Sequence, residues 1–336
     1  MKSYGGLWQG ITSLEALRAA MARAARQKAN RNPVRKFLDN ADNELGALQR
    51  DLQTASWRPS PFVQFPVLDP KPRLISCAAF RDRVVHHSLC DAIGPLLERS
   101  FIPDSFACRL GKGANRAIFR AQAMARRWEY FGKLDIRKYF DSIDHEILLS
   151  ALQPRFREAS VRSLLETIIR FPLPGQQPGK GLPIGNLTSQ WFANTYLDAC
   201  DHHALETLRV GGYLRYMDDV LIFDRSPQML NEQVGSLATW LKDQRALAVK
   251  TERLLVGACR TGVPFLGWRV FPGFIRLQPE RRKGSRGLLR RREREFRAGT
   301  ISAEKLTESV QAIVAGVRAV RPGFRFDRWG FPGLES

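Results

Sequence analysis

The sequence predicts an α+β fold in which helices and short strands are mixed. Two observations support this class. The first is helical spacing of apolar residues, as at Val84, Val85, Leu89, Ile93 and Leu97. The second is a set of short apolar strands that do not alternate regularly with the helices, unlike the strands of a doubly wound parallel sheet. Apolar residues make up 44% of the 336 residues, which is enough for a sizeable core.

In the first half of the chain, helical patterns surround one extended segment. Ser13 is positioned to cap the first helix. Five prolines from Pro59 to Pro72 predict strands and turns over residues 57–70. A short buried strand is expected over residues 131–136. The helices expected in this half cover residues 13–29, 37–52, 78–98, 113–129 and 145–152.

In the second half, a stretch rich in Pro, Gly and Gln at residues 171–182 predicts a loop. The last part, residues 275–297, is strongly basic, with ten Lys or Arg and three Glu. A short amphipathic helix follows beyond Thr300. The remaining expected elements are helices over 191–208 and 226–246, and strands over 212–216 and 220–223, near Ala248 and over 264–270.

The charge balance predicts a polyanionic partner. The chain has 53 Lys and Arg against 33 Asp and Glu, a net charge of +20. No apolar run approaches the ~20 residues that span a bilayer, so a membrane partner is not expected. The five cysteines are far apart and form no CxxC pair. This spacing argues against a zinc site or a disulfide framework and fits a reducing cytoplasm.

Three aspartates are candidates for metal chemistry. Asp218 and Asp219 lie between two apolar strands, which predicts a tight hairpin with both acids at its tip. Asp135 lies near the end of the expected strand at 131–136. Because clustered carboxylates repel one another without a cation, and oxygen ligands suit Mg²⁺, the three acids predict a two-ion site for phosphoryl transfer. A polar turn without chemistry is the alternative.

Two motifs resemble those of reverse transcriptases. Residues 216–219 read Tyr-Met-Asp-Asp, like the catalytic box of that family, and Asp135 followed by Phe140 resembles its first aspartate motif. The resemblance covers about residues 67–270. It implies a right-hand polymerase with fingers, an antiparallel-sheet palm and a small helical thumb, which copies RNA into DNA with two Mg²⁺ ions, for which Mn²⁺ can substitute. By resemblance, the catalytic acids are Asp135, Asp218 and Asp219, and the metal contacts are Asp135, Ile136, Asp218 and Asp219.

The resemblance also implies contacts with the incoming dNTP. Phe140 matches an aromatic residue that packs on the sugar and excludes a 2′-hydroxyl, although an ordinary core Phe is the alternative. Lys71 and Arg73 match a basic fingers motif that holds the triphosphate, where the arginine fork suits phosphate oxygens; a solvated charged strand is the alternative. Lys250 matches a lysine that protonates the departing pyrophosphate.

The segment from Gly181 to Gln190 departs from the pattern of most related polymerases, which read Gln-Gly, three residues, Ser-Pro. Here Ile184 replaces the usual Gln, and Gln190 replaces the usual Pro. This form resembles the reverse transcriptases of diversity-generating retroelements, which copy a template-repeat RNA with errors at adenines. Ile184 and Gln190 would border the templating base pair, where an apolar Ile cannot donate the hydrogen bond that Gln could. Retron, group-II-intron-like and abortive-infection polymerases are the alternatives.

Further motifs resemble surfaces that hold template and primer. Residues 105–113 resemble a fingers motif, and residues 263–268 resemble the hairpin that grips the primer end, with Gly267 allowing close backbone approach. The basic segment 281–297 predicts sequence-independent contacts with phosphates. The template and primer contacts expected are Arg109, Gly267, Trp268, Arg281, Arg282, Arg290 and Arg291.

The implied partners are template RNA, cDNA, dNTPs and a multimeric accessory variability protein. Basic residues in the N-terminal helices are expected to face RNA or this protein: Arg18, Arg23, Arg26, Lys28, Arg31, Arg35 and Lys36. A catalytically inactive RNA-binding scaffold is an alternative of a different class. The expected organisation is an N-terminal helical extension at 1–60, fingers at 61–130, palm at 131–153, a fingers loop at 154–180, palm with hairpin and primer grip at 181–274, and thumb and tail at 275–336.

Overall fold

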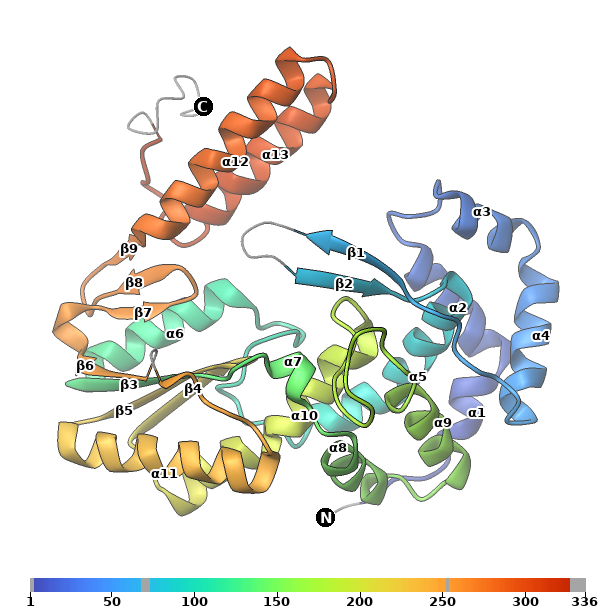
Figure 1. Cartoon of the computed structure of the whole chain (residues 1–336), viewed down its shortest axis with the longest axis horizontal. Helices are drawn as coiled ribbons and strands as arrows, with labels where there is room; N and C mark the ends of the chain where they lie inside the picture. Colours follow the sequence, from blue (N-terminus) through green and yellow to red (C-terminus); the bar gives the residue numbers. More distant parts are fainter. Residues whose placement is uncertain (1–2, 68–72, 252–253, 327–336) are drawn as a thin grey trace. The chain divides into compact units, whose positions relative to one another are not determined.

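The computed structural model describes residues 3–67, 73–251 and 254–326 (Figure 1). The chain folds into two compact units, each made of three segments. The first unit comprises Met1–Pro103, Asp135–Leu208 and Ser236–Thr251, and the second comprises Asp104–Leu134, Arg209–Gly235 and Glu252–Ser336. Both units combine helices with antiparallel strands, which confirms the predicted α+β class. None of the helices in the described residues is long and apolar enough to cross a membrane.

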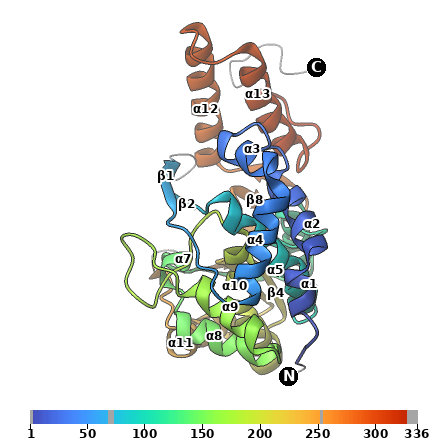
Figure 2. The same ribbon diagram turned by 90° about the vertical axis from the view of Figure 1, so that its right-hand side faces the viewer.

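The first unit is built around the long helix α5 (Phe80–Glu98). The apolar positions predicted for this helix are all fully buried. Figures 1 and 2 show α5 surrounded by other helices of the unit. Gly94 allows one of them to approach closely, because a Cβ at this position would lie 2.8 Å from the Trp191 ring. The helices that pack on α5 are α1 (Trp8–Thr12), α2 (Leu14–Ala25), α3 (Asn32–Asp39) and α10 (Leu187–His202).

The N-terminal helices confirm one prediction and correct two others. Ser13 caps α2, since its Oγ accepts a hydrogen bond from the Ala16 amide at 3.2 Å. The helix ends at Ala25 rather than Ala29, and Gln27 beyond it adopts a left-handed conformation (φ 59°). The single helix predicted over 37–52 is wrong. α3 is separated from α4 (Ala41–Gln53) at Asn40, whose φ of −122° is not helical.

The rest of the first unit includes a two-stranded hairpin and the helices that follow Asp135. Strands β1 (Val63–Val67) and β2 (Arg73–Cys77) pair antiparallel, and Val63 lies opposite Cys77. The predicted loop at 171–182 is confirmed. α10 begins at Leu187, four residues before the predicted start, so the segment 188–190 forms its first turn. The other elements are α7 (Tyr139–Ser142), α8 (His145–Leu152), α9 (Ala159–Ile169) and the π-helix His203–Thr207.

The second unit contains a four-stranded sheet in the order β4-β5-β3-β6. β4 pairs antiparallel with β5, and β3 pairs antiparallel with β6. Figure 1 shows α6 above this sheet and the start of α11 below it. Gly132 on β3 accommodates α11, because a Cβ there would meet Val234 at 2.6 Å. The elements are β3 (Tyr130–Asp135), β4 (Gly212–Tyr216), β5 (Asp219–Asp224), β6 (Leu255–Ala258), α6 (Ala114–Arg127) and the first part, up to Gly235, of α11 (Pro227–Arg245); β6 was not predicted.

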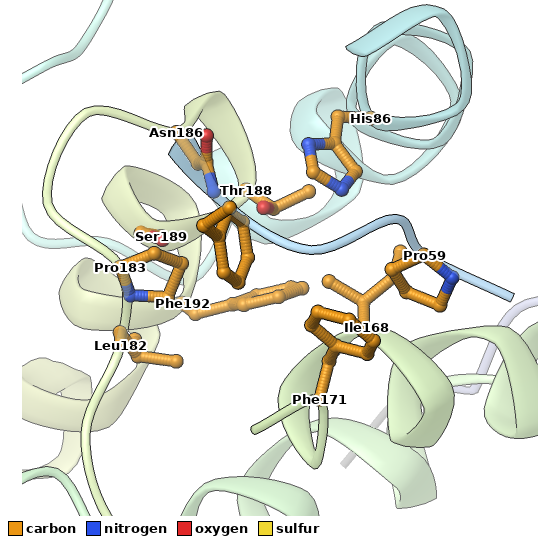
Figure 3. Close-up of a pocket in the computed structure, with 11 residues that line it drawn as sticks. Pro59, His86, Ile168, Phe171, Leu182, Pro183, Asn186, Thr188, Ser189 and Phe192 are labelled. Atoms are coloured by element: carbon orange, nitrogen blue, oxygen red, sulfur yellow. The ribbon is translucent and has the colours of Figure 1, made fainter. Parts of the chain in front are cut away.

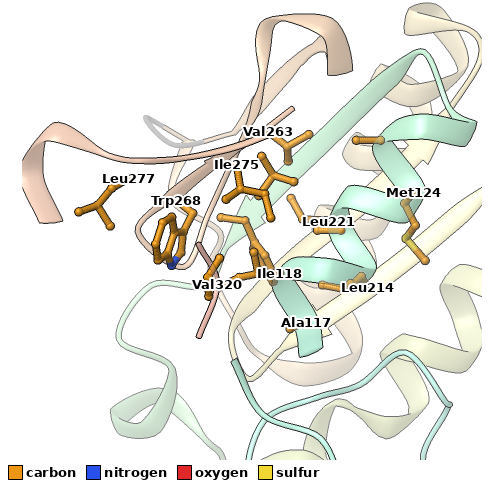
Figure 4. Close-up of a cluster of buried hydrophobic side chains, with 14 of the residues drawn as sticks. Ala117, Ile118, Met124, Leu214, Leu221, Val263, Trp268, Ile275, Leu277 and Val320 are labelled. Atoms are coloured by element: carbon orange, nitrogen blue, oxygen red, sulfur yellow. The ribbon is translucent and has the colours of Figure 1, made fainter. Parts of the chain in front are cut away.

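A second sheet in this unit has the order β7-β8-β9 and is covered by one hydrophobic cluster. Figure 4 shows Trp268 and Ile275 of this sheet packed in the same cluster as Ile118 of α6. Leu289 and Val317 bring the two C-terminal helices into the cluster. The elements are β7 (Val263–Phe265), β8 (Trp268–Val270), β9 (Ile275–Leu277), α12 (Pro279–Arg297) and α13 (Ala303–Arg318).

Candidate active site

The predicted hairpin with an acidic tip is confirmed. Tyr216, the last residue of β4, lies opposite Asp219, the first residue of β5. Met217 and Asp218 therefore form the two-residue turn between the strands. Met217 has a φ of 55°, a left-handed conformation that is costly for a residue with a side chain. The hairpin thus holds two adjacent acids at a tight, strained turn.

Arg215 on β4 supports this turn from inside the protein. Its side chain is fully buried, and Nη1 donates a hydrogen bond to the Met217 carbonyl at 3.2 Å. Its backbone also binds the segment before α6. The Arg215 amide donates to the Asp104 carbonyl, and the Arg215 carbonyl accepts from the Phe106 amide, both at 2.9 Å. Sequence reasoning missed this residue, although a charged residue within an apolar strand was a visible signal.

Lys133 on β3 forms an ion pair with one of the acids. Its Nζ lies 3.0 Å from the Asp219 carboxylate and also donates to the Pro264 carbonyl at 3.0 Å. The two side chains are 17% and 20% exposed, so this contact is largely shielded from water. Lys133 connects the acidic hairpin with β7. This role was also missed, because it depends on contacts between residues far apart in the sequence.

Asp135 is the last residue of β3 and is bound by Lys250. In the first unit, the Lys250 amide donates to the Asp135 carbonyl at 2.9 Å, and its Nζ lies 2.6 Å from Oδ1. Ile136 is buried and forms a single bridge with Val249. Among the described residues no strand forms near Ala248, where one was expected; the segment is held by this bridge and by the Arg137 amide, which donates to the Ala248 carbonyl at 2.7 Å. Lys250 therefore contacts a predicted catalytic acid.

The acids have the donor chemistry that a hard divalent cation requires. Asp135 and Asp219 each attract an ammonium group, which shows that both positions favour a cation. β5, which begins at Asp219, is the neighbour in the sheet of β3, which ends at Asp135. Within either unit, the described residues contain no group of three His, Cys, Asp or Glu side chains that could hold a metal. The carboxylate oxygens fit Mg²⁺ by type, and a set of three acids stays a prediction.

The segment from Phe140 to Gly185 is held by backbone contacts in the first unit. Phe140 is half-exposed, in contrast to the buried Tyr139 beside it, and its carbonyl accepts from the Leu182 amide at 2.9 Å. The Ile184 carbonyl accepts from the Ser76 amide of β2, also at 2.9 Å. Gly185 has a φ of 112°, and a Cβ there would lie 2.8 Å from Ile75. Ile184 is thus fixed against the β1–β2 hairpin, with its side chain half-exposed.

A small cavity lies beside the first turn of α10, among residues of the first unit (Figure 3). Its volume is about 10 Å³, close to the space that one water molecule needs. His86, Asn186 and Ser189 line it, and each has a buried polar atom without a hydrogen-bond partner among the described residues. Burial lowers the pKa of His86 to about 3, so its imidazole is neutral. Gln190 lies in the same helical turn and is half-exposed.

The other residues expected to bind nucleotide and template differ in exposure. Lys71 lies outside the described residues. Arg73 is exposed at the start of β2 in the first unit. In the second unit, Arg109 is half-buried and donates to the Ser105 carbonyl at 2.8 Å. Arg73 is therefore accessible to a ligand, whereas part of the Arg109 guanidinium is hydrogen-bonded to the backbone of its own loop.

The predicted primer-grip region is a packed hairpin. Trp268 is fully buried, so its indole belongs to the core. Gly267 has a φ of 79° and lies close to Arg281, since a Cβ there would meet that side chain at 2.6 Å. Arg281 donates to the Leu266 carbonyl at 2.9 Å, and burial lowers its pKa. Arg282 and Arg290 are exposed on α12, whereas Arg291 is half-buried.

Comparison with known proteins gives the family. A family model described as reverse transcriptase (RNA-dependent DNA polymerase) matches residues 68–270, which is more than half of the chain. The chain belongs to the reverse transcriptase family. The matched segment includes Asp135 and the acidic hairpin, so the motifs read from the sequence lie within the family region.

Curated proteins similar to this reverse transcriptase include bacterial and plant chains. It is 26% identical over 176 residues to Protein YkfC of Escherichia coli (strain K12), which covers 48% of this chain and 46% of the relative. It is 27% identical over 92 residues to nuclear intron maturase 1, mitochondrial, of Arabidopsis thaliana, covering 27% and 13%. It is 29% identical over 121 residues to nuclear intron maturase 4, mitochondrial, of the same plant, covering 33% and 15%. The matches therefore span less than half the length of these relatives.

Proposed function

We propose that this reverse transcriptase is an RNA-directed DNA polymerase with Asp135, Asp218 and Asp219 as its catalytic acids. The observation that carries the proposal is the acidic hairpin and its support. A buried arginine holds the strained turn, and Lys133 holds Asp219. A polar turn without chemistry would need neither a fully buried guanidinium nor a left-handed Met. The template RNA, the cDNA and the dNTPs are the proposed substrates and product.

The proposed metal contacts are Asp135, Ile136, Asp218 and Asp219. Two Mg²⁺ ions, or Mn²⁺ in their place, would supply activation of the primer 3′-hydroxyl and charge stabilisation at the leaving pyrophosphate. The chain's own contribution is to hold the carboxylates. Lys133 and Lys250 neutralise two of them and are positioned to keep the carboxylates in place when a substrate phosphate approaches. Lys250 is also the proposed donor of a proton to pyrophosphate.

Nucleotide selection is proposed to involve Phe140, Ile184 and Gln190, with Arg73 and Lys71 on the triphosphate. The half-exposed ring of Phe140 supports a contact with the sugar, because a core Phe would be buried like Tyr139. Template and primer contacts are proposed for the exposed side chains of Arg282 and Arg290, and for Arg109 and Arg291. The buried Trp268, with Gly267 and Arg281, is proposed to shape this surface rather than to touch the primer directly.

We further propose that the enzyme belongs to a diversity-generating retroelement and copies a template-repeat RNA with errors at adenines. The support is the Ile184 and Gln190 pair, together with the way Ile184 is held. The Ser76 amide donates a hydrogen bond to the Ile184 carbonyl. This bond fixes the apolar Ile184 side chain at a position where most related polymerases have the side-chain amide of Gln. A multimeric accessory variability protein is the proposed protein partner. The fingers, palm and thumb ranges given above are part of the same proposal.

An intron-type reverse transcriptase is the second candidate. The observation that favours it is that similar proteins of Arabidopsis thaliana carry the name intron maturase. The two candidates differ in their template: a template-repeat RNA in one case, and an intron RNA in the other. They also differ in fidelity, because only the first predicts errors concentrated at template adenines.

The test is primer extension on an RNA template, followed by sequencing of the cDNA. We expect RNA-dependent extension with errors at adenines, and fewer such errors in Ile184→Gln, which restores the amide. Errors spread evenly over the four bases, unchanged in Ile184→Gln, would contradict the retroelement proposal and favour the intron or retron type. If the chain makes no cDNA even with its cognate RNA and accessory protein, it is an RNA-binding scaffold.

A further inference from the structure

The first unit has a group of cations at the junction of three helices. Arg83 of α5 donates to the Ala24 carbonyl near the end of α2 at 2.5 Å. Its guanidinium lies 5.6 Å from the centre of the Phe80 ring, and that ring contacts Phe37 of α3 edge-on at 5.0 Å. Arg83 therefore occupies a fixed position where α2, α3 and α5 meet.

Lys28 and Arg31 follow directly in the turns that connect α2 with α3. The Lys28 amide donates to the Ala25 carbonyl at 2.8 Å, and the Arg31 amide donates to the Lys28 carbonyl at 3.0 Å. Burial lowers the pKa of Lys28, and the positive charges of Arg83 and Arg31 lower it further. Burial likewise lowers the pKa of Arg83. The three cations are thus close enough to repel one another.

These charges are not neutralised within the described part of the chain. Among those residues, Lys28, Arg31 and Arg83 have no acidic partner, and the nearby Asp91 is already paired with Arg23. Arg26, in the turn after α2, and Arg35 and Lys36, on α3, are exposed and also lack an acidic partner there. The Cys77 thiol also lies near Lys28 and Arg83. Three cations that repel one another and have no carboxylate partner among the described residues form a site that an anion would stabilise.

We propose that Lys28, Arg31 and Arg83 form a phosphate-binding site that holds the backbone of an RNA strand. The adjoining exposed cations Arg26, Arg35 and Lys36 make the surface longer than one phosphate, which favours a polyanion over a free phosphate ion. Arginine suits such a site because its fork binds phosphate oxygens in pairs. Lys28 and Arg31 lie outside the segment that matches the family model, residues 68–270, whereas Arg83 lies within it.

The choice of RNA rather than DNA rests on the proposed function, but the binding itself requires no polymerisation. The test therefore uses the full chain with Asp218→Asn, in the absence of dNTPs. The probe is a short labelled single-stranded RNA, and its fluorescence anisotropy is measured across a series of salt concentrations. The variant is Lys28→Ala with Arg31→Ala, which leaves the structural hydrogen bond of Arg83 intact.

Loss of two phosphate contacts predicts a specific change in salt dependence. The slope of log K against log salt should fall in magnitude by about 1.4, since each contact with a single strand contributes about 0.7. At about 0.1 M salt this corresponds to roughly 25-fold weaker binding. The charge-preserving pair Lys28→Arg with Arg31→Lys should retain most of the affinity. A thermal melt of each variant confirms that it is folded.

The matched control removes two cations that already have acidic partners. Arg170 pairs with Glu146, and Lys305 pairs with Glu308, and all four side chains are exposed. The double variant Arg170→Ala with Lys305→Ala should bind RNA almost as wild type does. Equal losses in the two double variants would overturn the proposal, because they would reflect net charge alone. The proposal would also be overturned if Lys28→Ala with Arg31→Ala bound RNA as wild type does but was no longer stabilised by inorganic phosphate in the thermal melt. That result would indicate a site for a free anion.

Discussion

Lys133 gives the most informative perturbation of the acidic hairpin, because it is the ammonium partner of Asp219. The substitution Lys133→Met keeps a long unbranched side chain and removes the charge. It breaks the contacts of Nζ with the Asp219 carboxylate and with the Pro264 carbonyl, both at 3.0 Å. If Asp219 is a metal ligand, Mg²⁺ can replace the lost ammonium in the variant. The variant should therefore respond to Mg²⁺ more strongly than wild type.

The expected magnitude follows from the geometry of this contact. A hydrogen bond to a charged group contributes about 1.5–3 kcal/mol when shielded from water. The side chains of Lys133 and Asp219 are 17% and 20% exposed, so we expect a loss of about 2 kcal/mol without metal. This loss lowers the melting temperature by roughly 4–8 °C, at about 2–4 °C per kcal/mol. A saturating ion that takes over the role of the ammonium should recover most of it.

The assay is thermal unfolding over a series of Mg²⁺ concentrations for wild type and Lys133→Met. The control is Lys242→Met, which changes an exposed lysine of α11. We expect the difference between Lys133→Met and wild type to shrink as Mg²⁺ rises, while the control follows wild type throughout. A difference that stays constant at every Mg²⁺ concentration would show that the Asp219 carboxylate does not contact the ion. That result would refute the reasoning without depending on catalytic activity.

Three further predictions concern the frame around the site. Arg215→Met leaves the buried Met217 carbonyl without this donor, and we expect the free energy of unfolding to fall by about 1–3 kcal/mol. Single-turnover kinetics should show a lower rate of nucleotide incorporation at unchanged affinity for template and primer, with partial recovery of the rate in Arg215→Lys. Gly185→Ala forces a φ of 112° on alanine, so chemical denaturation should show a free energy of unfolding lower by about 1–3 kcal/mol. The control Gly316→Ala, where the added methyl group enters open space on α13, should be neutral or stabilising. The pKa of His86 is lowered to about 3, so below pH 6.5 the unfolded chain binds a proton that the folded chain excludes. The free energy of unfolding should therefore fall by about 1.4 kcal/mol per pH unit toward pH 3. His86→Gln should flatten this pH dependence, and an equal slope in both proteins would contradict a neutral, buried His86.

The local parts of the fold and site could be predicted from the sequence. The hairpin around Asp218 and Asp219 was predicted because the pattern of two apolar strands with acids between them lies within a dozen residues. The Ser13 cap and the buried face of α5 were predicted for the same reason, since capping and helical periodicity are local signals.

The parts that could not be predicted depend on contacts between distant residues. Lys133 reaches Asp219 and Pro264, which lie 86 and 131 positions away in the sequence. The break between α3 and α4 at Asn40 was missed because the apolar spacing continues across it. The early start of α10 was missed because Thr188, Ser189 and Gln190 are polar and resemble a loop in sequence. In the structure, Thr188 and Ser189 are buried within the first turn.

The central claim is that the aspartates of the hairpin perform nucleotidyl transfer. The most direct measurement is single-turnover incorporation of one dNTP on an RNA template with an annealed primer, comparing wild type with Asp218→Asn. Asp224→Asn is the matched control, because Asp224 is an acid at the other end of β5. We predict that incorporation is abolished in Asp218→Asn while template binding and folding are retained, and that Asp224→Asn remains active. Incorporation by Asp218→Asn at the wild-type rate would contradict the claim.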